Sequence, residues 1–119
     1  MKSDPSEYKN IIEKLLEKTR QRRVEWEQAF SSSFKCAVGS GDGGSFSFTI
    51  SSSDDEPSSL RMSDESHNTI FWVTSNDLPT SPEEEEISQL IEELYELARR
   101  QALKVDQKLE LASSLLDRV

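Results

Sequence analysis

The stretch Phe46-Ser47-Phe48-Thr49-Ile50-Ser51 decides the fold, because apolar and small hydroxyl side chains alternate along it without a break. A period of two is typical of a β-strand that buries one face and turns the other to water. The stretch therefore predicts a strand whose Phe46, Phe48 and Ile50 enter the core, in a sheet with one covered and one open face.

Similar segments lie on both sides of this strand. Phe34, Cys36 and Val38 alternate with polar or small residues before the glycine-rich turn 39–44, Leu60 and Met62 flank Arg61, and residues 69–74 form another apolar segment. Consecutive strands with short turns favour an antiparallel meander, here of four strands. Residues 24–27 also have strand-like spacing, although a continued helix is an alternative there.

The chain outside the strands has the apolar periodicity of helices. Asp4-Pro5-Ser6-Glu7 is a helix-start pattern, and the stripe that follows ends in the cations of residues 20–23, which suit a helix C-terminus. Ser81-Pro82-Glu83-Glu84 is a second start pattern, so a second helix is expected from residue 82. Its stripe comprises Ile87, Leu90, Ile91, Leu94, Leu97, Ala98 and Ala102.

The C-terminal helix can be read in two ways near Lys104-Val105-Asp106. Asp106 could cap a new short helix, or one helix could run through residue 118, because the apolar residues keep a near-heptad rhythm. We favour the break, since helices beyond about 20 residues are uncommon in small domains.

These elements predict one α+β domain over residues 1–119. It has an N-terminal helix, a four-stranded antiparallel β-meander, and one long or two shorter C-terminal helices packed on one face of the sheet. The other face, with Ser47, Thr49 and Ser51, is expected to meet water.

Charge and composition exclude several classes of protein. The net charge is −9, and between residues 36 and 98 a single cation, Arg61, stands against fourteen acidic residues, which argues against nucleic-acid binding. One cysteine permits no internal disulfide, and no apolar run reaches the about 20 residues that span a bilayer. With no signal-peptide pattern at the start, we expect a cytoplasmic protein that binds no membrane.

No motif of catalytic or cofactor-binding chemistry stands out. The glycine-rich turn lacks the Gly-Lys-Ser/Thr of a phosphate loop, and His67 is the single histidine. The acidic residues 54–56 and 64–65 do not match a calcium loop. Cys36 is expected in the core, and the arginines of residues 20–23 and 99–100 are interpreted as helix-end charge. We therefore predict no catalytic residue, no metal and no cofactor.

Two apolar surfaces are left over and predict contact with a partner. Ile70-Phe71-Trp72-Val73 is apolar on both faces of one strand, so one pair should stay uncovered unless helices cover both sides. At the C-terminus Leu109, Leu115 and Leu116 extend the stripe beyond what the sheet can cover. These seven residues are the candidate partner-contact site.

Most of the chain also resembles a group of known sequences. The resemblance is carried by Leu15-Leu16-Glu17-Lys18-Thr19, then Val24-Glu25-Trp26-Glu27, a β-meander, and the helical segment Leu94-Tyr95-Glu96-Leu97-Ala98-Arg99-Arg100-Gln101-Ala102-Leu103. It is to small uncharacterised bacterial and phage-type proteins with no assigned activity, which often have glycine where Arg22 stands. The resemblance implies the same fold and carries over no functional residue.

The expected function is a non-enzymatic protein-interaction module whose partner is another protein or itself, as a homodimer. An alternative is an acidic inhibitor, of the immunity or antitoxin type, that masks a basic partner; the segment of residues 36–98 would suit that role. A third reading is an enzyme that uses carboxylates alone, although no spacing places two of them across a pocket.

Overall fold

The computed structural model describes residues 5–40, 44–52, 57–75 and 82–119. Helix α1 (Pro5–Arg20) is followed by strands β1 (Glu27–Phe30), β2 (Ser33–Ser40), β3 (Gly44–Ser51), β4 (Ser59–Asp64) and β5 (Thr69–Thr74). Helices α2 (Pro82–Leu103) and α3 (Val105–Asp117) complete the chain. The proposed caps Asp4 and Ser81 lie outside the described residues.

The strands form one antiparallel sheet in the order β1-β2-β3-β4-β5, so the meander is confirmed, but it has five strands where four were expected. The additional strand, β1, begins at Glu27, the last residue of the alternating segment 24–27 that could also have been helical. Two antiparallel registers are irregular, between Gln28 and Phe30 at one edge and between Met62 and Ser63 at the other.

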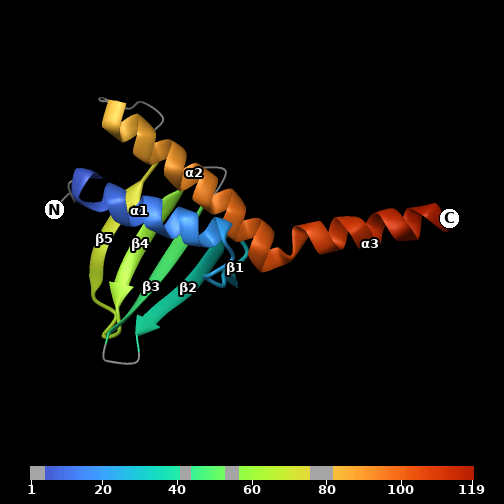
Figure 1. Ribbon diagram of the computed structural model, residues 1–119, viewed down its shortest axis with the longest axis horizontal. Coiled ribbons are helices and arrows are strands. Elements are labelled where there is room, and N and C mark those ends of the chain that lie inside the picture. Colours follow the sequence, from blue (N-terminus) through green and yellow to red (C-terminus); the bar gives the residue numbers. More distant parts are fainter. Residues whose placement is uncertain (1–4, 41–43, 53–56, 76–81) are drawn as a thin grey trace.

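Helices α1 and α2 lie across one face of the sheet and form the second layer (Figure 1). Ion pairs join Lys9 to Glu86 and Arg20 to Glu93, so the two helices run in the same direction. The buried core between the layers comprises Ile12, Leu15, Leu16, Trp26, Phe34, Cys36, Phe48, Ile50, Leu60, Met62, Phe71, Val73, Ile87, Ile91, Leu94 and Ala98.

Two residues expected in this core are only half covered. Val38 and Phe46 are opposite each other in the β2–β3 register, four positions from the Phe34–Ile50 pair that lies at the centre of the core. Figure 1 shows this hairpin extending past the helices, so its far end has no layer above it.

Helix α1 ends where the cationic segment predicted. Arg22 has φ 58, and the backbone N–H groups of Arg22 and Arg23 donate to the carbonyls of Thr19 and Lys18 at 3.0 and 2.9 Å. This pair of bonds is the Schellman motif, whose left-handed residue is usually glycine. Arg22 therefore occupies the position that favours glycine in this motif.

The long C-terminal segment breaks at Lys104, as favoured, but Asp106 is not the cap. Lys104 itself is the N-cap residue, in a left-handed conformation without a side-chain capping bond, and Asp106 lies in the first turn of α3 and pairs with Arg100 at 2.8 Å.

The expectation that both C-terminal helices pack on the sheet is wrong for α3. The helix buries none of its residues and projects from the body of the protein beyond α2 (Figure 1). The turn at Lys104 directs α3 away from the sheet, so only α2 contributes to the second layer.

Candidate functional site

The open face of the sheet carries a row of side chains that crosses all five strands. The strand registers place Glu27 opposite Lys35, Lys35 opposite Thr49, Thr49 opposite Arg61, and Arg61 opposite Trp72. Because side chains opposite each other in an antiparallel sheet share a face, these five residues form one line. We call this line the cross-strand row.

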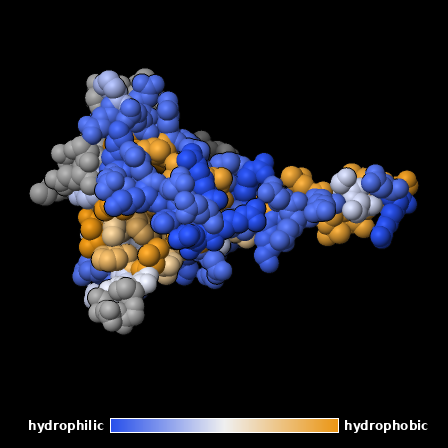
Figure 2. Space-filling model, viewed as in Figure 1, coloured by the Kyte–Doolittle hydropathy of each residue, from blue (hydrophilic) through white to orange (hydrophobic). Residues whose placement is uncertain are grey.

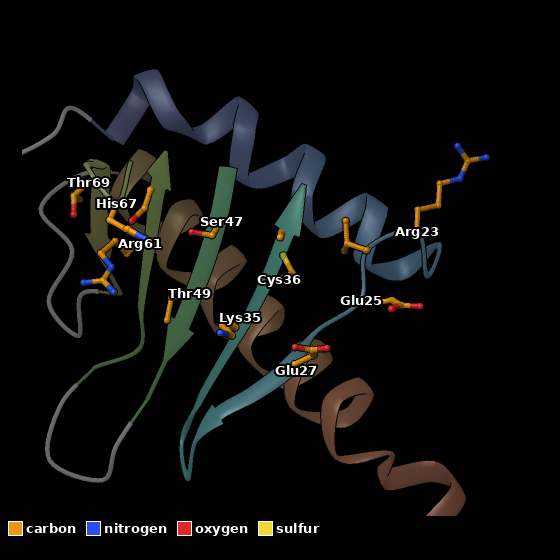
Figure 3. A pocket seen from close by; sticks show the side chains of 13 residues that line it. Arg23, Glu25, Glu27, Lys35, Cys36, Ser47, Thr49, Arg61, His67 and Thr69 are labelled. Carbon is orange, nitrogen blue, oxygen red and sulfur yellow. The ribbon is translucent and has the colours of Figure 1, made fainter. Parts of the chain in front are cut away.

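The middle of this face is a shallow depression of about 760 Å³. Figure 3 shows Lys35, Ser47 and Thr49 at its centre, between Arg61 on one side and Glu27 on the other. Its floor is rich in hydroxyl groups, with Ser47, Thr49, Ser63 and Thr69 all lining it. The depression is therefore polar and wide, without the enclosure that water-excluding catalysis needs.

Two cations in the cross-strand row have no partner among the described residues. Lys35 and Arg61 make no ion pair or side-chain hydrogen bond there, even though Glu27 is the cross-strand neighbour of Lys35. By contrast, Lys9 and Arg20 on α1 are both paired with glutamates of α2. The positive charge of the open face is thus available to an external group.

A second depression, of about 430 Å³, adjoins the first and shares Lys35, Thr49 and Arg61 with it. Two exposed aromatic side chains line it, Phe30 from β1 and Trp72 from β5, with 77% and 63% of their surfaces exposed. Since large aromatic side chains are usually covered, this pair makes the depression a candidate contact surface.

His67 belongs to a turn at the rim of the larger depression. The Asp64 carboxylate accepts hydrogen bonds from the backbone N–H groups of Ser66 and Asn68, both at 2.9 Å, and His67 has φ 67. These bonds, led by the one from Asn68, lower the pKa of Asp64. Within the described part of the chain, no three His, Cys, Asp or Glu side chains are grouped as metal ligands would be.

Cys36 is buried, with 4% of its surface exposed, on the helix-covered side of β2. Burial raises the pKa of its thiol to about 12, against a smaller opposing effect of a backbone hydrogen bond at Phe48. A thiol in this state is protonated near neutral pH and is a poor nucleophile.

The predicted contact strand, β5, has one covered and one open side. Phe71 and Val73 are buried, with the ring of Tyr8 stacked on that of Phe71 at 4.4 Å between centroids. Ile70 and Trp72 are exposed, so the helices leave this pair uncovered. Phe71 and Val73 are therefore corrected from contact candidates to core residues, because α1 covers their side.

The second predicted contact surface, on α3, is exposed throughout. Leu109, Leu115 and Leu116 expose 59%, 52% and 73% of their surfaces, and Leu111 is exposed as well. Figure 2 shows hydrophobic residues gathered on the projecting α3, separated from the body of the protein.

Sequence reasoning did not single out Phe30, Lys35 or Arg61 as site residues. Lys35 in β2 and Arg61 in β4 alternate with the apolar residues of their strands. This alternation alone could have assigned both cations to the open face of the sheet. Their placement on either side of Thr49 depends on strand register, and Phe30 belongs to β1, which was not among the four predicted strands.

Comparison with known proteins gives no relative: no family model, no curated protein and no solved structure matches this chain. None of the described helices is long and apolar enough to cross a membrane.

Proposed function

We propose that this protein is a non-enzymatic protein-interaction module that self-associates through α3, as a homodimer. The observation that carries the proposal is that α3 buries none of its residues, although it has a continuous apolar stripe. The stripe comprises Val105, Leu109, Ala112 and Leu116, Leu115 lies beside it, and Val119 continues its spacing just after the helix ends.

An isolated helix of this kind is unstable in water. α3 has 13 residues, and isolated helices shorter than about 12–15 residues are marginal in water because nucleation is costly. Protein helices of this length gain most of their stability by packing an apolar face. Packing against another chain would supply that stabilisation.

A second copy of α3 is the partner that the spacing favours. The stripe residues are separated alternately by four and three positions, the heptad pattern of paired helices. The opposite side of α3 carries Asp106, Glu110, Ser113, Ser114 and Asp117 and would face water. Two-fold pairing is the commonest symmetry of soluble assemblies.

Light scattering at micromolar concentration tests the proposal. We expect a mass twice the chain mass of 13.5 kDa, and a return to 13.5 kDa for Leu116→Lys, which places a charge in the stripe. Ser114→Lys adds the same charge to the polar side of α3 and is the matched control. A wild-type protein that scatters as a 13.5 kDa monomer would contradict self-association.

The acidic-inhibitor function is a weaker candidate. Several glutamates of α2 are already neutralised within the chain, since Glu86 pairs with Lys9, Glu93 with Arg20, and Glu96 with Arg99. Fewer carboxylates are then available to a basic partner than the 23 acidic residues of the chain suggest.

A further inference from the structure

We propose that the open face of the sheet binds an extended acidic peptide segment of a partner protein. One carboxylate is held between Lys35 and Arg61, and large apolar or aromatic side chains of the peptide pack on Trp72 and Phe30. This site is separate from α3 and goes beyond self-association.

The two cations are spaced to share one anion. Lys35 and Arg61 lie on β2 and β4, on either side of Thr49. Neighbouring strands are about 4.8 Å apart, so the Cβ atoms of the two cations are about 10 Å apart. Both side chains are long enough to converge above Thr49, whose hydroxyl can donate to the same carboxylate.

The exposed aromatic side chains set the length of the ligand. Phe30 and Trp72 belong to the outermost strands, β1 and β5, and both line the smaller depression. Four inter-strand spacings amount to about 19 Å, and an extended peptide advances about 3.3 Å per residue, so about six residues cross the face. A central acidic residue with a large apolar residue on each side fits this arrangement.

Charge favours a peptide over a nucleic acid. The whole chain carries −9, and Glu25 and Glu27 border the larger depression. A nucleic-acid strand would bring one phosphate charge per nucleotide against these carboxylates, with two cations in the cross-strand row to neutralise them. A short peptide needs to bring only the one carboxylate that the two cations hold.

The edges of the sheet are unfavourable for binding a peptide by strand addition. Both outer registers are irregular, beside Phe30 in β1 and at Ile70 in β5, and such irregularities interrupt an edge that could pair with another strand. We therefore expect the peptide to bind to the side chains of the open face.

The experiment is a fluorescence-anisotropy titration of the full chain into a short labelled peptide with one central glutamate and a phenylalanine two residues away on each side, so that all three side chains lie on one face of the extended peptide. We expect saturable binding that Lys35→Gln and Arg61→Gln each weaken by about ten-fold, the effect of losing one hydrogen bond between charged groups. Trp72→Thr should weaken binding similarly. Lys14→Gln is the matched control, because it removes the same charge from an exposed, unpaired lysine of α1.

The proposal would be overturned by no binding of the peptide, by equal weakening with Lys14→Gln, or by equal binding of a matched peptide whose central residue is lysine. Binding of labelled single-stranded DNA in place of the acidic peptide, lost in Arg61→Gln, would assign the face to nucleic acid and equally refute it. Repeating the titration with Leu116→Lys separates this site from self-association, because that variant changes α3 alone.

Discussion

The indole Nε1–H of Trp26 donates a hydrogen bond of 3.0 Å to the hydroxyl of Thr19, and both side chains are buried. The Thr19 hydroxyl in turn donates to the Leu15 carbonyl at 2.8 Å. The backbone N–H of Trp26 donates to the Gln101 side chain at 3.2 Å. Trp26 thus ties the end of α1 and the end of α2 to the segment that leads into β1.

Replacing Thr19 with valine keeps the shape of the side chain and removes the hydrogen-bond acceptor of Trp26. The buried indole N–H is then unsatisfied, so we expect a loss of about 1–3 kcal/mol in the free energy of unfolding. Urea denaturation measures the loss. Thr19→Ser, which keeps the hydroxyl, should lose less, and a Thr19→Val protein as stable as wild type would show that this bond contributes nothing.

Replacing Arg22 with glycine should stabilise the protein. Arg22 adopts φ 58, a conformation that costs a residue with a side chain about 1–2 kcal/mol and glycine almost nothing. After the larger entropy loss of glycine, we expect a net gain of about 0.5–1 kcal/mol in the free energy of unfolding. Arg23→Gly is the control, since Arg23 has no positive φ; a stabilisation there of equal size would contradict the explanation.

The two faces of β3 should differ in their sensitivity to mutation. Phe48 is buried under the helices, and Phe48→Ala should cost about 3–5 kcal/mol by leaving a cavity. Thr49 lies on the open face, so Thr49→Ala should lower the free energy of unfolding by less than about 1 kcal/mol. Phe46→Ala should fall between them, because its ring is partly exposed. Equal costs for Phe48 and Thr49 in urea denaturation would mean that both faces are covered.

The buried thiol of Cys36 should make stability fall at alkaline pH. Its pKa is about 12 in the folded protein and about 8.5 in an unfolded chain, so above pH 8.5 the unfolded state loses a proton that the folded state keeps. The free energy of unfolding should then decrease by up to about 1.4 kcal/mol per pH unit from this group. Urea titrations between about pH 8.5 and 10 test this, and the decrease should be absent from Cys36→Ala.

The helix-covered face of the sheet was predictable because it depends on local alternation. In β3, each apolar residue lies two positions from the next, and no distant contact can change which of them share a face. The end of α1 was predictable for a similar reason, since a cluster of cations is favourable at a helix C-terminus. The short strand β1 was missed, because its four residues, Glu27–Phe30, include one bulky apolar side chain and show no alternation.

The candidate site likewise has a part that was predictable from each strand alone and a part that depends on tertiary structure. Lys35 and Arg61 could each be assigned to the open face from their own strands, whereas their position on either side of Thr49 depends on the pairing of β2, β3 and β4. The exposure of Trp72 depends on which side of β5 α1 covers, and Tyr8 packs on Phe71, on the other side of the strand. No local pattern carries that information.

The sequence by itself determined the order of the helices and of strands β2 to β5, the antiparallel meander and the apolar stripe of α3, because each follows from the spacing of neighbouring residues. Only the tertiary structure decided that α3 stands apart from the sheet and that two unpaired cations converge on one row. Both outcomes depend on the direction of the chain after a turn, at Lys104 and between the strands, and that direction is set by backbone torsions that no local apolar pattern reports.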